Sequence, residues 1–136
     1  MVKLKQRVPE FTQYVQTICI PWTNETYEGW VATVAGWGKT ETGIQSDVLM
    51  QTKLTVLANH ECGNLYPIGM LCGKPHKLSS TCRGDSGGPF MLHIGHSRWT
   101  LIGVYSWRFG ACESVETVGA TRVSEYIDWI KHTVNN

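Results

Sequence analysis

The sequence predicts an all-β domain that ends in one helix. Between residues 30 and 123, short runs of apolar and β-branched residues alternate with turn residues, as in an antiparallel barrel or sandwich. After residue 123 the apolar side chains recur at helical spacing instead. With 136 residues the chain is long enough for one core and too short for two barrels of ordinary size. We therefore expect a single β domain with a helix at its C-terminal end.

The first part of the chain reads as an extended lead-in over residues 1–22. Val2 and Leu4 alternate with lysines, and Pro9 and Pro21 mark turns. The folded domain is expected over residues 23–136. Its predicted strands are 30–37, 49–57, 69–71, 89–94, 99–107 and 119–123.

The final segment has the pattern of an amphipathic helix. Its apolar positions are Val123, Ile127, Ile130 and Val134, and Ser124 is the expected N-cap. Such a helix docks one face on the domain and serves as scaffold.

Composition excludes several classes of protein. The net charge is +1 with both signs mixed, so neither nucleic acid nor a membrane surface is an expected partner. No apolar run approaches the roughly 18 residues of a membrane span, and the opening residues lack the apolar stretch of a signal peptide. Five cysteines and a glycosylation sequon at Asn24 nevertheless indicate a secreted, oxidised protein.

The segment with the clearest chemical signal is Gly84-Asp85-Ser86-Gly87-Gly88. A serine hydroxyl is a weak nucleophile, so a protein that uses one aims donors at the oxyanion that forms during attack. Glycine next to the serine permits the tight turn that presents backbone N–H groups. Asp85 would be buried in such a turn, where a carboxylate needs a cation or several donors.

The run from Cys82 to Pro89 resembles the nucleophile loop of the chymotrypsin/trypsin serine proteases. Further matches follow the family's order: Gly36-Trp37-Gly38, Met70-Leu71-Cys72-Gly73, Val104-Tyr105-Ser106-Trp107 and Arg122-Val123. The resemblance covers essentially the whole chain, but only the second half of the family's protease domain. It implies a six-stranded antiparallel barrel, a C-terminal helix, and a connector from a first barrel over residues 1–22.

The resemblance also implies roles for the site residues. Ser86 is the expected nucleophile, and the N–H groups of Gly84 and Ser86 are the expected oxyanion donors. Asp85 is expected to pair with a new amino terminus formed by activation cleavage. The expected substrate contacts are Ser80 at the pocket floor, Arg108 and Val118 at its walls, and Ser106 and Trp107 along the substrate backbone.

Two bulky walls and a serine floor suggest a shallow or obstructed pocket that suits a small apolar residue. Arg108 could instead favour an acidic group, although its charge is expected to lie in solvent. A shift by one position would place Gly119 at the wall in place of Val118.

Disulfides implied by the resemblance are Cys62–Cys72 and Cys82–Cys112, which leaves Cys19 for a partner elsewhere, such as a light chain. Many family members also bridge two strands at the positions of Ala32 and Leu92. Both are apolar in this chain, so an apolar contact is expected there.

Catalysis by this family needs a histidine and an aspartate in addition to the serine. No histidine here has the family's Ala-Ala-His-Cys context: His60, His76, His93, His96 and His132 read as surface residues. The aspartate of the family pattern would precede Met1. We therefore expect a partial domain that is inactive alone. Its expected partner is the missing N-terminal half or a light chain. The turn at residues 83–88 is expected to be mobile.

Two alternatives remain. His93 and His96 lack the cysteine or carboxylate cluster of a metal site, so no metal or other cofactor is implied. A secreted, non-catalytic protease homologue that binds partners is the main rival to an endopeptidase acting on proteins or peptides. Retention of Gly84, Asp85 and Ser86 favours the enzyme, whereas an obstructed pocket favours the binding module.

Overall fold

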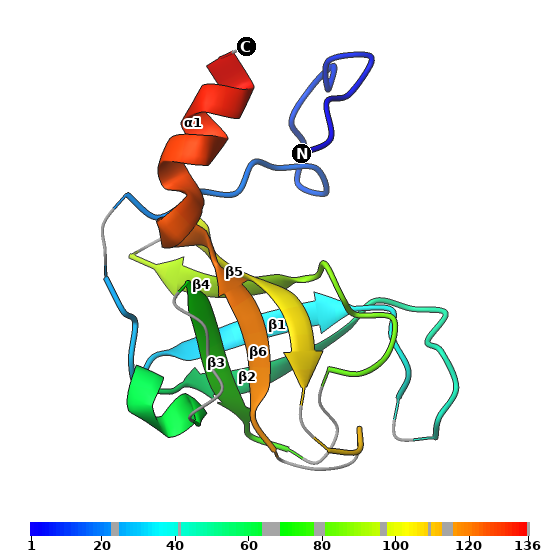
Figure 1. Ribbon diagram of the computed structural model, residues 1–136. Helices are drawn as coiled ribbons and strands as arrows, with labels where there is room; N and C mark the ends of the chain where they lie inside the picture. Colours follow the sequence, from blue (N-terminus) through cyan, green and yellow to red (C-terminus); the bar gives the residue numbers. More distant parts are fainter. Residues whose placement is uncertain are drawn as a thin grey trace.

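The computed structural model describes residues 1–22, 25–40, 42–63, 69–77, 81–95, 98–108, 110–112 and 116–135. Its strands are β1 (Val31–Gly36), β2 (Met50–Val56), β3 (Met70–Pro75), β4 (Pro89–Ile94), β5 (Arg98–Arg108) and β6 (Val118–Arg122). They close a barrel in the order β1-β2-β3-β6-β5-β4, and all neighbours are antiparallel. The predicted all-β barrel with a C-terminal helix is confirmed (Figure 1).

Strand β3 is longer than the sequence suggested, because it continues from residue 71 to Pro75. Gly73 and Pro75 both read as strand breakers. In the barrel, however, a side chain at Gly73 would overlap that of Leu54 on β2, so the glycine allows the two strands to approach closely. Pro75 lies at the strand end, opposite Leu54.

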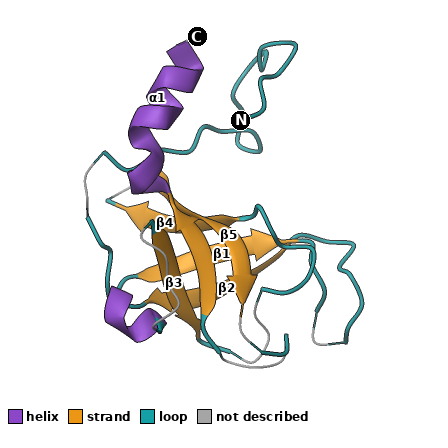
Figure 2. Cartoon of the chain, viewed as in Figure 1, coloured by secondary structure: helices purple, strands orange, loops and turns teal. Residues whose placement is uncertain are grey.

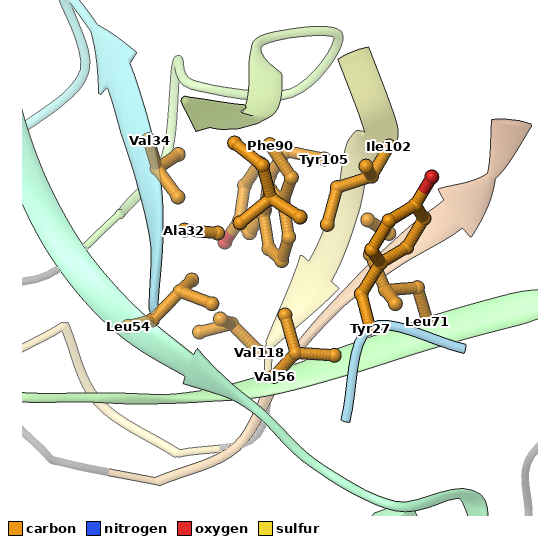
Figure 3. Packing of buried hydrophobic residues seen from close by; sticks show 12 residues of the cluster. Tyr27, Ala32, Val34, Leu54, Val56, Leu71, Phe90, Ile102, Tyr105 and Val118 are labelled. Carbon is orange, nitrogen blue, oxygen red and sulfur yellow. The ribbon is translucent and has the colours of Figure 1, made fainter. Parts of the chain in front are cut away.

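The core lies inside the barrel and receives side chains from all six strands. Figure 3 shows Phe90, Leu54 and Val118 among the side chains that fill it. Pairing of Thr33 with Met91 and of Val34 with Phe90 sets the β1–β4 register. One step further along, this register places Ala32 opposite Leu92, and both belong to the core cluster. The apolar contact expected there in place of a disulfide is consistent with this arrangement.

Two short 3-10 helices and one α-helix complete the described fold; helices are purple in Figure 2. They are η1 (Asn59–Cys62), η2 (Val123–Tyr126) and α1 (Ile127–Asn135). The expected N-cap at Ser124 is wrong, because Ser124 lies inside η2, whose first turn follows directly from β6. Val134 is 66% exposed, so the apolar stripe of α1 is only partly covered.

Residues 1–18 are exposed, and the lead-in first joins the barrel at Cys19. The N–H of Cys19 donates to the carbonyl of Trp99, and the N–H of Leu101 donates to that of Cys19. Figure 1 shows the N-terminal segment and α1 at the same end of the barrel. There the ammonium group of Lys131 lies 5.2 Å from the centre of the Trp22 ring.

An apolar groove of about 430 Å³ lies between α1 and the barrel. It is lined by Val104, Thr121, Val123, Tyr126, Trp129 and Ile130. Tyr126 and Trp129 are 45% and 53% exposed, so this apolar surface is open to solvent.

The structure contains the disulfides Cys62–Cys72 and Cys82–Cys112, and Cys19 is a free thiol. The first joins η1 to β3, and the second ties the loop before β4 to the segment after β5. Among the described helices, none has the length and apolar character that crossing a membrane requires.

Candidate active site

Ser86 lies on a tight turn that the barrel holds in place. The N–H of Gly87 donates to the carbonyl of Tyr105 on β5, and the N–H of Tyr105 donates to the carbonyl of Gly88. A further bond from the N–H of Gly88 to the carbonyl of Asp85 closes the turn. Ser86 itself is exposed. The turn therefore presents the serine hydroxyl to solvent from a fixed backbone.

Asp85 points the opposite way and is only 8% exposed. Its carboxylate accepts a hydrogen bond from the N–H of Gly38 at 2.8 Å and another from the N–H of Cys82 at 2.7 Å. No cation pairs with it, since the one ion pair of the described residues joins Lys131 to Asp128. Two backbone donors thus meet the need of a buried carboxylate for hydrogen bonds.

Glycine is required at two positions around this carboxylate. A methyl group at Gly36 or at Gly38 would overlap the side chain of Asp85. The Gly-Trp-Gly sequence at residues 36–38 therefore supplies both space and a hydrogen-bond donor. Sequence reasoning used these glycines only as a family marker and missed their contact with Asp85.

A small pocket of about 50 Å³ lies next to this carboxylate. It is lined by Val34, Gly36, Gly38, Lys39, Thr40, Met50, Gln51, Thr52, Thr81 and Asp85. The pocket is thus a recess beside the Asp85 carboxylate, and Lys39 is the one basic residue among those that line it.

The N–H groups of Gly84 and Ser86 are the two expected oxyanion donors. Gly84 has a φ of 99°, in the left-handed region that glycine favours. Neither the N–H of Gly84 nor that of Ser86 is hydrogen-bonded to any residue of the described chain. The hydroxyl of Ser86 likewise makes no hydrogen bond there. The turn therefore combines an exposed serine hydroxyl with two backbone N–H groups that no described residue uses.

The described histidines lie elsewhere. His76 contacts Thr55 through its ring, and the ring of His93 lies against Trp99 with centroids 5.1 Å apart. His60 lies in η1 and His132 in α1. None of these four forms a hydrogen bond with Ser86, and His96 lies outside the described residues. No base for the serine is therefore found in the described chain.

Strand β5 extends past its neighbour near the serine. Its pairing with β4 ends where Val104 lies opposite Pro89, whereas its pairing with β6 continues to Arg108. A bulge at Ser106 shifts the β6 register, and Ser106 is exposed. The indole of Trp107 covers Gly119 so closely that a methyl group there would overlap it. Residues 106–108 thus extend beyond the end of β4 beside the serine turn.

The side chain of Arg108 does not extend into solvent, so that expectation is wrong. Its Nη1 atom donates to the carbonyl of Thr81 at 2.6 Å and to that of Cys112 at 3.1 Å. Arg108 therefore bridges the segment before the serine turn and the segment after β5, the two segments that the Cys82–Cys112 disulfide also joins.

Val118 offers no surface to a substrate, because it is completely buried in the core cluster. The structure thus does not support its expected place at a pocket wall. The alternative wall residue, Gly119, lies beneath Trp107. Ser80 and the sequon residue Asn24 lie outside the described residues.

Burial raises the pKa of Tyr105 above its ordinary value of 10.0, and the positive charge of Arg108 offsets part of that effect. Tyr105 is 4% exposed and stacks on Phe90. It therefore stays a neutral phenol beneath the serine turn.

Within the described part of the chain, no three histidine, cysteine, aspartate or glutamate side chains gather as metal ligands do.

Comparison with known proteins agrees with this geometry. The sequence model of the trypsin family matches residues 1–130. A collagenase of Hypoderma lineatum is 40% identical over 131 residues, which cover 90% of this chain and 48% of that protein. The serine proteinase stubble of Drosophila melanogaster is 33% identical over 141 residues, covering 96% of this chain and 18% of that protein.

The fold has a close counterpart among solved structures. The structure of HL collagenase superposes with a TM-score of 0.79 at 35% identity, covering 93% of this chain and 57% of that one. This chain therefore spans about half the length of the collagenases and a smaller part of stubble.

Proposed function

Because the chain belongs to the trypsin family of serine proteases, we propose that it supplies the nucleophile half of a serine endopeptidase. The observation that carries this proposal is the turn at Ser86. It presents an exposed hydroxyl beside two N–H groups, those of Gly84 and Ser86, that no described residue uses. A protein with no acyl-transfer chemistry has no need for this combination.

The proposed reaction is acyl transfer. The oxygen of Ser86 attacks the carbonyl carbon of a peptide bond while a histidine accepts the hydroxyl proton. The N–H groups of Gly84 and Ser86 stabilise the oxyanion, the amine product leaves with the proton, and water then hydrolyses the acyl-enzyme. Protein or peptide is the proposed substrate, and no cofactor takes part.

The histidine and the aspartate are proposed to come from residues beyond these 136. The relatives are about twice as long or longer, and the described histidines do not bond Ser86. The apolar groove between α1 and the barrel supports a covering partner, because Tyr126 and Trp129 line it while remaining about half exposed. We infer that a first barrel, or the segment that carries it, covers this surface.

Asp85 is proposed to switch the site during activation. Its carboxylate lies beside the 50 Å³ pocket and has backbone donors, but it forms no ion pair with a described residue. An amino terminus released by cleavage would bring the missing positive charge. The mobility expected for residues 83–88 without that charge remains a prediction.

Substrate selection is proposed to depend on residues 106–108. The extension of β5 beyond β4 gives a substrate strand an edge to pair with, beside Ser106 and Trp107. Arg108 bridges Thr81 and Cys112, and so occupies space that a large substrate side chain would need. We propose a preference for small residues at this position, with Ser80 at the floor.

Secretion is proposed as well. Two disulfides in a chain of 136 residues favour an oxidising compartment. The sequon at Asn24 would carry a glycan there.

The test is labelling by a fluorophosphonate, which reacts with an activated serine. The chain is compared alone and joined behind the first half of the Hypoderma lineatum collagenase, which supplies the missing part of the domain. We expect slow labelling of the chain alone and rapid labelling of the joined protein, with none in its Ser86→Ala variant. Rapid labelling of the chain alone would refute the need for a second half. A joined protein that folds but labels no faster than Ser86→Ala would refute Ser86 as the nucleophile.

A further inference from the structure

A basic groove of about 270 Å³ is lined by residues of β1, of β2 and of the segment just after the end of β3. Figure 1 shows these three strands side by side in the barrel wall. Its lining residues are Thr33, Gln51, Thr52, Lys53, His76 and Lys77. None of them is a carboxylate, and none belongs to the serine turn or to residues 106–108. The proposed protease chemistry therefore leaves this groove without a role.

The sheet register gathers cationic side chains on this face. Leu54 is fully buried, so its neighbours Lys53 and Thr55 on β2 point outward. Lys74 on β3 lies opposite Thr55, and the N–H of His76 donates to the carbonyl of Lys53 at 3.1 Å. Diagonal neighbours in such a ladder lie roughly 7–8 Å apart. Lys74 therefore adds its charge at the edge of the groove.

His76 is held in a fixed position within this group. Its Nε2 atom lies 2.8 Å from the hydroxyl oxygen of Thr55, in addition to the backbone bond with Lys53. Nδ1 is then the ring atom that can reach a ligand. The imidazole thus lines the groove from a defined orientation, unlike a mobile surface side chain.

No carboxylate of the described residues pairs with the lysines of this groove. The only ion pair of the described residues is formed by Lys131 and Asp128 on α1, so Lys53, Lys74 and Lys77 have no carboxylate partner. The whole chain carries a net charge of only +1, so this is a local concentration of positive charge. Like charges on one face repel each other, and an anion in the groove would relieve that repulsion.

We propose that the groove docks an acidic peptide segment of a protein partner. Glutamate or aspartate side chains would bind the ammonium groups of Lys53 and Lys77, and the side chains of Thr33 and Gln51 would bond to peptide groups. The basic face crosses three strands, roughly 10 Å. That length accommodates a few residues of an extended peptide. It is short for a nucleic acid or a sulfated polysaccharide, whose phosphate or sulfate groups extend along a longer polymer.

The experiment measures binding of a fluorescein-labelled hexaglutamate peptide to the 136-residue chain by fluorescence anisotropy. A hexaglutamine peptide controls for charge, and a heparin oligosaccharide tests the polysaccharide alternative. The groove variant combines Lys53→Glu with Lys77→Glu. The matched control combines Lys3→Glu with Lys5→Glu, which changes the net charge equally on the exposed lead-in.

We expect the wild-type chain and the control variant to bind hexaglutamate. The groove variant should bind it at least about tenfold more weakly. Binding should also weaken as salt rises, and hexaglutamine should not bind. Equal loss in both variants, no binding by wild type, or binding of heparin alone would each overturn the proposal. Circular dichroism shows whether each variant is folded. If the glutamate variant is misfolded, a variant with Lys53→Gln and Lys77→Gln replaces it, and the same results support or overturn the proposal.

Discussion

The carboxylate of Asp85 and the backbone N–H of Gly38 are joined by a buried hydrogen bond of 2.8 Å. The bond links the serine turn to the end of β1, two parts of the chain that lie 47 residues apart. It exists because Gly38 has no side chain that would occupy the place of the carboxylate. The position of the turn at Ser86 therefore depends on Gly38, just after β1, as well as on the turn's own residues.

Replacing Asp85 should destabilise the domain. In Asp85→Ala the N–H groups of Gly38 and Cys82 lose their acceptor in a buried place, and we expect a loss of about 3 kcal/mol in the free energy of unfolding. Urea denaturation measures the change. Asp128→Ala is the matched control, because the side chain of Asp128 is fully exposed, and it should leave stability nearly unchanged. Equal effects of the two substitutions would contradict the role of the buried carboxylate.

Arg122 should be as important for the opposite end of the barrel. Its guanidinium donates to the carbonyls of Met70 and Thr26 at 3.2 and 3.3 Å and to the side-chain oxygen of Asn59 at 2.8 Å. Arg122→Met leaves these acceptors unbonded, and we expect it to cost about 2–3 kcal/mol.

The same substitution at Arg98, which is exposed at the start of β5, provides the control for Arg122. Thermal unfolding followed by circular dichroism compares the two variants. Our account of Arg122 fails if both melt at the wild-type temperature.

Tyr105 should make stability depend on alkaline pH. Burial raises its pKa in the folded state above 10.0, so the unfolded chain loses the phenolic proton more readily. The contribution of the neutral Tyr105 side chain to the free energy of unfolding is complete below about pH 10. It is lost as pH rises through the folded-state pKa. Denaturation measured between about pH 8 and pH 11 should show this decline in wild type and a shallower one in Tyr105→Phe.

Tyr14, which is 88% exposed, gives the matched control for this titration. Tyr14→Phe should keep the wild-type pH dependence. Absorbance at about 295 nm follows phenolate formation. Comparison of Tyr105→Phe with wild type should show that the substitution removes a tyrosine whose pKa lies above 10.0. A wild-type decline that persists unchanged in Tyr105→Phe would assign the effect to another group.

Arg108 should limit the size of the substrate side chain. Arg108→Gly removes the bridge between Thr81 and Cys112. In the joined protease we expect it to raise kcat/KM for substrates with large apolar residues relative to alanine by about tenfold. Fluorophosphonate labelling should stay unchanged, because Arg108 does not hold the nucleophile. Unaltered selectivity with normal labelling would contradict this role of Arg108.

Much of the fold was predictable because successive residues of a strand face opposite sides of the sheet, so apolar residues recur at every second position. Buried positions such as Val34, Leu54 and Phe90 alternate with less buried ones, and these strands were placed within a residue or two. The end of β3 was missed, because Gly73 and Pro75 are breakers by local preference and strand residues only when Leu54 packs against them. Likewise, a serine near a helix start predicts a cap, whereas β6 leads directly into η2.

The candidate site was predictable where it rests on local sequence. The turn at Ser86 is encoded by its own glycines. In contrast, the donor at Gly38 and the bridge made by Arg108 depend on segments brought together only by barrel closure. Val118 was misplaced for the same reason. Its place in the sequence suggested a wall of the substrate pocket, but it lies on the inward face of β6 and belongs to the core.

The bond between Cys82 and Cys112 has a consequence for control by redox conditions. Cys82 donates its N–H to Asp85, and Cys112 accepts a hydrogen bond from Arg108. A reductant that opened this one disulfide would loosen the turn at Ser86 and the segment that holds Arg108 in one step. Cleavage rate and selectivity should then decline together on exposure to thiols, and return together on reoxidation.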